Sequence, residues 1–129
     1  MSTTVTLRTC DLIGAALDWA VAKACNAFVA FDFYGRLMDM SDLAQFGARP
    51  TYSPSTDWSQ GGPLLYQHRI SSIAPGTASG VWWGQMPGSS VLYSTKGPDP
   101  LVAGLRRLVS ENLGDSVDVP AELVGGGHE

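Results

Sequence analysis

The chain has 129 residues, of which 44% are hydrophobic and 16% are charged, and its formal net charge is −4. This length fits one domain that buries enough apolar surface to fold without a metal or a disulfide, and we expect no cofactor. The acidic balance disfavours generic nucleic-acid binding, and no run approaches the roughly 18 apolar residues of a membrane span. Charged residues usually make up about 25% of a globular domain, so their scarcity favours a homo-oligomer or another partner face.

The first predicted elements are a short strand and a long helix. Residues 3–7, TTVTL, alternate β-branched and apolar side chains, which is typical of a strand. A helix is predicted over residues 10–25, with Thr9 as its N-cap and Asn26 as the residue that ends it. Its buried stripe consists of mostly small residues at helical spacing: Ile13, Ala16, Leu17, Ala20, Val21 and Ala24.

Cys10 and Cys25 lie at opposite ends of this predicted helix. At about 1.5 Å of rise per residue they would be more than roughly 20 Å apart, whereas a disulfide needs Cα atoms within about 7 Å of each other. We therefore expect two free thiols, which suit a reducing cytosol. The N-terminus has no apolar signal core, so the predicted location is the cytoplasm.

Runs of β-branched and aromatic residues predict four more strands, over residues 27–34, 64–73, 81–86 and 91–95. The last two would form a hairpin across the turn PGSS. Between the first two, residues 41–46 could form a short helical turn, and residues 47–63, which are rich in turn formers, predict a loop.

The sequence KGPDPLVAGLRRLVSENLG predicts a second helix with clear start and stop signals. Asp99 is an N-cap, Pro100 occupies the first helical position, where its missing N–H costs nothing, and Gly114 ends the helix. Arg106 and Arg107 fall on the face away from the apolar stripe, so we expect them in solvent. The stripe itself consists of Leu101, Val102, Leu105, Leu108 and Val109.

A last strand over residues 116–120, SVDVP, completes the predicted elements. Together they predict an α+β fold in a single domain over residues 1–124. Two main helices would pack on a mostly antiparallel sheet of four to six short strands. Residues 125–129, GGGHE, are expected to be a disordered tail.

Four segments, in chain order, carry a family resemblance: DLIGAALDWAVAKA, YSPSTDWSQGGPL, VWWGQM and GPDPLVAGLRRLVSENLGDSVDVPAEL. They resemble the NinX-like family of small phage proteins, whose function is unknown, and the likeness extends from about Asp11 to Leu123. The resemblance implies a phage or prophage origin and action in the host cytoplasm. It implies no particular activity.

Residues 51–63, TYSPSTDWSQGGP, combine turn formers with two large aromatic side chains. Ser, Thr and Asp side chains can bond nearby backbone N–H groups and lock turns, so the segment could be structural, with Tyr52 and Trp58 anchored on the face of Leu12 and Trp19. Alternatively it lines a pocket, because binding residues lie disproportionately on positioned loops. The predicted ligand-binding residues are then Tyr52, Ser53, Ser55, Thr56, Asp57, Trp58, Gly61 and Gly62.

Aromatic and basic residues supply further candidate contacts. Trp82 and Trp83 are adjacent in a predicted strand and therefore face opposite ways. One is expected in the core or under a loop, and the other, together with Trp19, is a candidate for stacking or for an interface. The N–H groups at the start of the second helix could attract an anion, although Asp99 would occupy that end. The candidate anion contacts are Lys96, Arg69 and Arg106.

Signatures of catalysis and of metal binding are scarce. The sequence has no GxSxG elbow, P-loop or GxGxxG, and no Cys/His set with zinc spacing, so we assign no catalytic and no metal-binding residue. The favoured function is a non-catalytic accessory protein in the host cytoplasm that binds a host or phage protein, or sequesters a small ligand such as a nucleotide defence signal. The alternative is a small hydrolase in which His68 lies within hydrogen-bond reach of Asp57 or of a Ser in the 51–63 loop.

Overall fold

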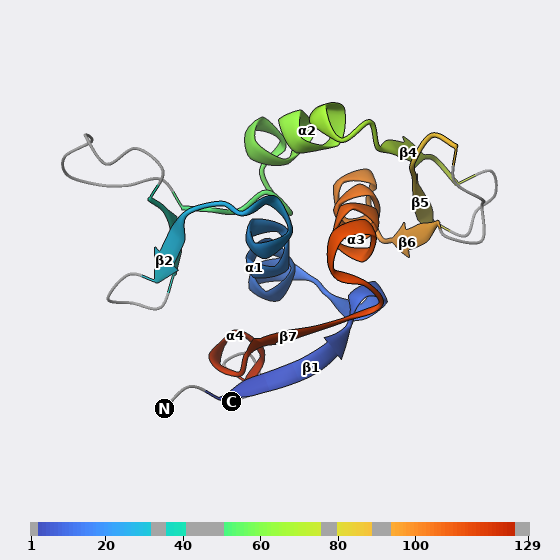
Figure 1. Ribbon diagram of the computed structural model, residues 1–129. Coiled ribbons are helices and arrows are strands. Elements are labelled where there is room, and N and C mark those ends of the chain that lie inside the picture. Colours follow the sequence, from blue (N-terminus) through green and yellow to red (C-terminus); the bar gives the residue numbers. More distant parts are fainter. Residues whose placement is uncertain (1–2, 32–35, 41–50, 76–79, 89–93, 126–129) are drawn as a thin grey trace.

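The computed structural model describes residues 3–31, 36–40, 51–75, 80–88 and 94–125. Two helices, α1 (Gly14–Cys25) and α3 (Pro100–Leu113), lie side by side in its centre, and α2 (Trp58–Gln67) lies across one end of both (Figure 1). Short antiparallel strands surround the helices. The α+β class predicted from the sequence is therefore confirmed.

Among the described residues the strands form three small antiparallel sheets, whereas the sequence predicted one. The long pair joins the ends of the chain: β1 (Thr4–Arg8) runs against β7 (Ser116–Pro120), from Thr4 opposite Pro120 to Arg8 opposite Ser116. A second pair is β2 (Val29–Phe31) with β3 (Leu37–Asp39). The sheets are separate because α3 occupies the centre of the molecule and they lie on different sides of it (Figure 1).

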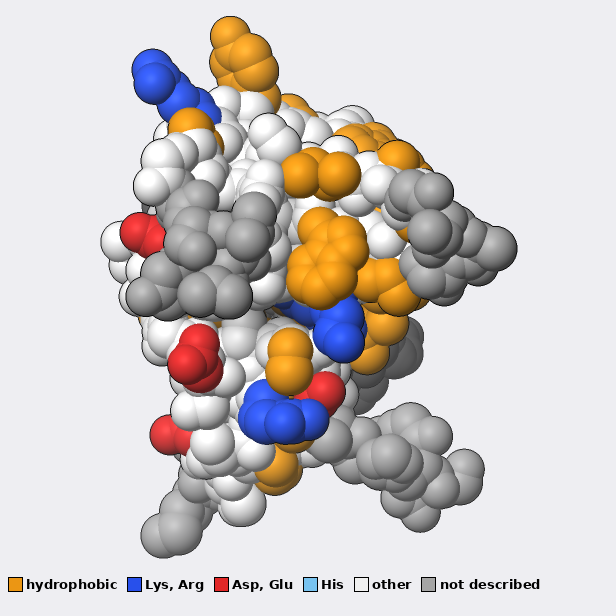
Figure 2. Space-filling model, turned by 90° about the vertical axis from the view of Figure 1, so that its right-hand side faces the viewer, with side chains coloured by type: hydrophobic (Ala, Val, Ile, Leu, Met, Phe, Trp, Pro, Cys, Tyr) orange, Lys and Arg blue, Asp and Glu red, His pale blue; other side chains and the backbone are white. Residues whose placement is uncertain are grey.

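The third sheet has the order β4 (Ser71–Ile73), β5 (Trp82–Gln85) and β6 (Thr95–Gly97). Its inner face packs closely on α3, because a Cβ added at Gly84 would collide with the carbonyl of Ala103. Its side of the molecule is shown in Figure 2, where hydrophobic side chains gather over much of the view. Strand β5 pairs with β6, which shares only Thr95 with the strand predicted over residues 91–95, and residues 91–93 lie outside the described part of the chain.

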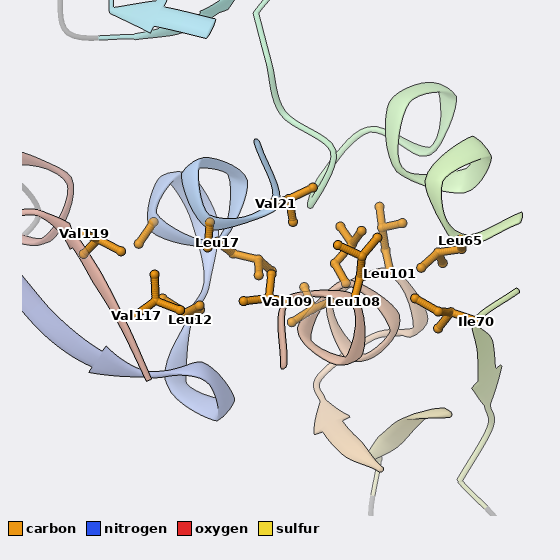
Figure 3. Close-up of a cluster of buried hydrophobic side chains, with 14 residues drawn as sticks. Leu12, Leu17, Val21, Leu65, Ile70, Leu101, Leu108, Val109, Val117 and Val119 are labelled. Carbon is orange, nitrogen blue, oxygen red and sulfur yellow. The ribbon is translucent and has the colours of Figure 1, made fainter. Parts of the chain in front are cut away.

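The core fills the space between α1 and α3 and continues to β7 on one side and α2 on the other (Figure 3). In β7 the alternation of the strand turns Val117 and Val119 inward, and from α2 Leu65 reaches the same cluster. Burial of this many aliphatic side chains is the main stabilising term of such a domain. The largest fully buried side chains are Leu12, Leu17, Leu105, Leu108, Val21, Val109, Val119 and Pro54.

The expectation that Arg106 and Arg107 lie in solvent is wrong, because both are buried. The first part of α3 has no solvent face, since α1, α2 and the three-stranded sheet all contact it. The Arg106 guanidinium donates to two backbone carbonyls, that of Leu12 over 2.9 Å and that of Lys96 over 2.8 Å. It thereby links the segment before α1 to strand β6.

Residues 58–67 form α2, where the sequence predicted a loop up to residue 63 and a strand from residue 64. Two glycines and Pro63 inside the segment lower its helix propensity. The helix forms because Asp57 caps it and because Gly61 and Leu65 pack on the core, which is a tertiary effect. The predicted strand is reduced to β4, which begins only at Ser71.

The helix predicted over residues 10–25 begins later than expected. Thr9 belongs to a short 3-10 turn, Thr9–Asp11, and its hydroxyl donates to the carbonyl of Gly114 over 2.6 Å instead of capping α1. Leu12, which follows, is extended and wholly buried. The chain therefore leaves the helical path to place Leu12 in the core, and α1 starts at Gly14.

Several predicted boundaries are confirmed because they rest on local chemistry. Asn26 ends α1 in the left-handed conformation, with φ of 55°. The Asp99 side chain accepts from the N–H of Val102 at the start of α3, where Pro100 is the first residue. Gly114 follows the last residue of α3.

The remaining predictions fall partly outside the described residues. Of the strand predicted over 27–34, residues 29–31 form β2 and residues 32–34 lie outside the description. The helical turn predicted over 41–46 also lies outside it. The predicted tail begins at Gly125, the last residue of the short helix α4 (Glu122–Gly125), and its other residues are not described.

Candidate ligand-binding pocket

A pocket of about 470 Å³ opens between the end of α1, the segment that leads into β2, the end of β3 and one face of α2. Its volume falls in the range of about 300–1,000 Å³ that is usual for ligand sites. Helix α2 contributes Gln60, Leu64, Gln67 and His68. The rest of the chain contributes Ala24, Cys25, Ala27, Phe28, Asp39 and Tyr52.

Helix α2 has three faces, which point to the pocket, to the core and outward. Residues three and four apart in the sequence share a face. Its pocket face starts at Gln60 and continues at Leu64 and Gln67. Its core face carries Gly61 and Leu65, both buried. The outer face carries the remaining large side chains: Trp58, whose ring lies over Gly62, and Tyr66, which is 88% exposed.

Tyr52 is held in place by hydrogen bonds on both of its sides. Its N–H donates to the carbonyl of Leu37 over 2.7 Å. The Gln60 side chain accepts from the N–H of Ser53 over 2.9 Å and donates to the carbonyl of Thr51 over 2.8 Å. The Gln60 amide therefore bonds the backbone on both sides of Tyr52, as a neighbouring strand would. The sequence did not predict this role because it did not predict α2.

The Tyr52 side chain is 9% exposed and lines the pocket. Its hydroxyl makes no hydrogen bond to any part of the chain that the structure describes. Burial, with smaller contributions from Cys25, Asp18 and Asp39, raises the pKa of Tyr52 well above its usual value. The phenol is therefore protonated at neutral pH, and it offers a hydrogen-bond donor to the pocket.

Asp57, Ser55 and Thr56, in the same segment as Tyr52, are bonded to the protein itself. Asp57 caps α2, accepting from the N–H of Ser59 over 2.9 Å and from its hydroxyl over 2.6 Å, and these bonds hold the pKa of Asp57 below its usual value. The N–H of Ser55 donates to Asp18 over 2.7 Å, and the Thr56 hydroxyl donates to the carbonyl of Ser53 over 3.5 Å.

Of the eight residues predicted to bind a ligand, Tyr52 lies in the pocket lining, and the others build the segment that supports it. Trp58 is 55% exposed on the outer face of α2. Gly61 is buried, and a Cβ added there would collide with the carbonyl of Pro54, so a glycine allows the two backbones to approach closely. His68, named for the alternative hydrolase, also lines the pocket, and the other lining residues were not predicted.

Asp18 on α1 is buried beneath this segment, and burial raises its pKa to about 6 although the Ser55 bonds oppose the shift. Because the folded state holds this proton more tightly than the unfolded state, the contribution of Asp18 to the free energy of unfolding should fall by about 2 kcal/mol as the pH rises from about 4 to about 6. Asp18→Asn keeps an acceptor for Ser55 and removes the charge. We expect the variant to be more stable than the wild type at pH 7, measured by urea denaturation between pH 4 and pH 7.

An exposed carboxylate supplies the control for this pH dependence. Asp115→Asn should keep the wild-type fall in stability between pH 4 and pH 6, because Asp115 is exposed. An unchanged pH profile in Asp18→Asn would show that the Asp18 carboxylate is not destabilising in the folded protein.

The acid–base pair proposed for a hydrolase is not brought together. Asp57 caps the start of α2 and His68 caps its end, so the ten-residue helix separates them by roughly 15 Å. The His68 ring contacts the Cys25 thiol, with 4.0 Å between Sγ and Nε2. Burial raises the pKa of the Cys25 thiol, so it is a neutral lining group and not an activated nucleophile.

No Lys or Arg is found among the described residues that line the pocket. The predicted anion contacts lie elsewhere: Lys96 is exposed on β6, Arg69 is exposed after α2, and Arg106 donates to backbone carbonyls in the core. The carboxylate of Asp39 lies in the lining, and that of Asp18 lies near Tyr52.

The tryptophans predicted as stacking or interface residues have different surroundings. Trp82 faces the same side of β5 as Gly84, which is the side of α3, whereas Trp83 faces outward and is 41% exposed. Trp83 is paired across the sheet with Ile73 and Lys96. Trp19 is half-buried, with the Lys23 ammonium 5.4 Å from its ring centre.

Within the described ranges, no group of three or more His, Cys, Asp or Glu could hold a metal ion. The helices of the same ranges are too short or too polar to cross a membrane. A family model described as bacteriophage P22, NinX, matches residues 8–112, a stretch that includes every residue named in the pocket lining. No curated protein sequence matches the chain significantly.

Proposed function

Since the chain belongs to the family of the bacteriophage P22 protein NinX, we propose that it is a phage-encoded accessory protein that binds a small molecule in the host cytoplasm. The ligand would occupy the pocket between α1, β3 and α2, and it would be held without being chemically changed. Sequestration of a host signal, including one used in defence, is the role that such a binder would serve.

The hydroxyl of Tyr52 is the observation that carries this proposal. A tyrosine hydroxyl needs a hydrogen-bond partner, which can be the protein, water or a ligand. Tyr52 has none among the described residues, and yet the Leu37 carbonyl and the Gln60 side chain fix its backbone in place. A hydroxyl donor that is rigidly positioned on a pocket wall is suited to a ligand.

The same pocket lacks an activated catalytic group among its described residues. The Cys25 thiol has a raised pKa, and His68 is separated from Asp57 by the length of α2. A bound molecule would meet hydrogen-bonding and apolar groups but no nucleophile prepared for attack. This supports binding over hydrolysis.

Native mass spectrometry of protein purified from host cells tests the proposal. We expect the wild type to carry a bound small molecule and Tyr52→Phe to lose most of it, because the variant removes only the hydroxyl. One lost hydrogen bond of about 1–1.5 kcal/mol corresponds to a roughly tenfold weaker affinity.

Tyr66→Phe is the matched control, since it makes the same chemical change on the exposed face of α2. It should retain the bound molecule at the wild-type level. Wild-type protein without any bound molecule, or equal retention by Tyr52→Phe and Tyr66→Phe, would contradict the proposal.

A second candidate function is supported by the outer face of the three-stranded sheet. Ile73 and Trp83 are direct cross-strand neighbours, and they are 43% and 41% exposed. Adjacent exposed apolar side chains of this kind occur at protein interfaces. A host or phage protein, or a second copy of the chain, that is captured by the wild type and lost with Trp83→Ala but not with Trp58→Ala would favour this function.

A further inference from the structure

We propose that the ligand of this pocket is an uncharged heteroaromatic molecule of the nucleobase or nucleoside class, and not a nucleotide. This inference rests on the proposed function and names the ligand chemistry of the same site. It follows from three properties of the described lining: the absence of cationic side chains, an apolar wall and a small set of hydrogen-bonding groups.

The charges of the described lining disfavour a phosphate. Phosphate groups in proteins are typically held by Arg or Lys side chains or by helix N-termini. The pocket lies at the C-terminal end of α1, where the carbonyl groups give the helix its negative end. The N-terminus of α2 is already occupied by the Asp57 carboxylate.

The apolar part of the lining favours a flat ring over a sugar or an amino acid. Ala24, Ala27 and Leu64 present only hydrocarbon, and Phe28 adds an aromatic ring that is 55% exposed. A sugar carries hydroxyl groups all around its ring, and those against this wall would lose their hydrogen bonds. A heteroaromatic ring has two apolar faces and places its polar atoms on its edge.

The polar part of the lining suits the edge of such a ring. Tyr52 offers a donor, and the Gln67 amide offers both a donor and an acceptor. Neither side chain has a hydrogen-bond partner among the described residues. Gln60, in contrast, uses its amide to position Tyr52. An uncharged ring with both donors and acceptors on one edge, which is the pattern of a nucleobase, matches Tyr52 and Gln67 together.

Calorimetric titration with adenosine, guanosine, cytidine and uridine, each compared with its 5′-monophosphate, tests the ligand class. We expect at least one nucleoside to bind, and its monophosphate to bind at least tenfold more weakly. Tyr52→Phe should weaken nucleoside binding by about tenfold, and Tyr66→Phe should leave it unchanged.

The location of binding is tested through Cys25, which lies in the lining, in a Cys10→Ala variant that removes the exposed thiol. A saturating nucleoside should slow alkylation of Cys25 by iodoacetamide at least tenfold. Binding without protection of Cys25 would place the nucleoside elsewhere and overturn the inference.

Different results would overturn the ligand class and the proposed binding of a small molecule. A monophosphate that binds as tightly as its nucleoside, or a natural bound molecule that contains phosphate and is lost in Tyr52→Phe, overturns the ligand class but leaves small-molecule binding in place. A protein that carries no bound molecule and binds none of the nucleosides overturns both.

Discussion

Arg106→Leu is expected to lower the free energy of unfolding by about 3 kcal/mol or more, measured by urea denaturation. The substitution keeps an apolar stem in α3 but leaves the carbonyls of Leu12 and Lys96 without their donor. Each buried polar group that loses its partner costs about 1–3 kcal/mol. Because Leu12 lies just before α1 and Lys96 lies in β6, the loss should loosen the contact of both with α3.

Arg8→Leu provides the control, since Arg8 makes its ion pair with Asp11 at the surface. Exposed ion pairs contribute little to stability, so this variant should remain close to the wild type. Equal effects of Arg106→Leu and Arg8→Leu would show that the buried guanidinium does not hold the elements together.

Gly61→Ala should destabilise the protein by about 2–3 kcal/mol, because overpacking a closely packed position costs this much. A Cβ at Gly61 would meet the backbone carbonyl of Pro54, which cannot move without its chain, and would come within 2.6 Å of a Leu101 methyl group. The variant should also weaken ligand binding, since α2 would be displaced from the segment that carries Tyr52.

Its neighbour Gly62 offers an unusually close control, one position along the same helix. There the nearest atom to an added Cβ is a Trp58 ring carbon at 3.6 Å, an ordinary contact. Gly62→Ala should therefore stabilise α2, by up to about 1 kcal/mol from helix propensity. Thermal denaturation of both variants checks the pair, and a change of the same sign in both would contradict the packing found at Gly61.

The sequence predicts correctly where structure depends on local chemistry. Asp99, Pro100 and Gly114 mark the ends of α3 because capping involves only neighbouring residues. Helix α2 was missed because Gly61, Gly62 and Pro63 argue locally against a helix, and the packing that overrides them comes from residues distant in the sequence. The burial of Arg106 was missed for the same reason.

The site could be predicted only in part. The polar and aromatic residues from Tyr52 to Trp58 predict a ligand site, and Tyr52 lines the pocket. Cys25 and His68 come from α1 and α2 and meet only through the fold. The helical spacing of Gln60, Leu64, Gln67 and His68 would have indicated a common face, but only once residues 58–67 had been recognised as a helix.

The structure explains the residue types of the segment YSPSTDW, residues 52–58. Asp57 starts α2, Ser55 joins the segment to α1 through Asp18, and Pro54 packs against Gly61. The polar groups of Ser55 and Asp57 form hydrogen bonds within the protein. The Tyr52 side chain of the same segment lines the pocket. The segment is thus a support that positions Tyr52.

A crystal structure of the protein purified directly from host cells tests the central claim most directly. We predict density for a small molecule in the pocket, with one of its acceptor atoms about 2.7–3.0 Å from the Tyr52 hydroxyl oxygen. A Tyr52 hydroxyl that bonds to the protein's own chain, in a pocket that holds only water, would contradict the claim.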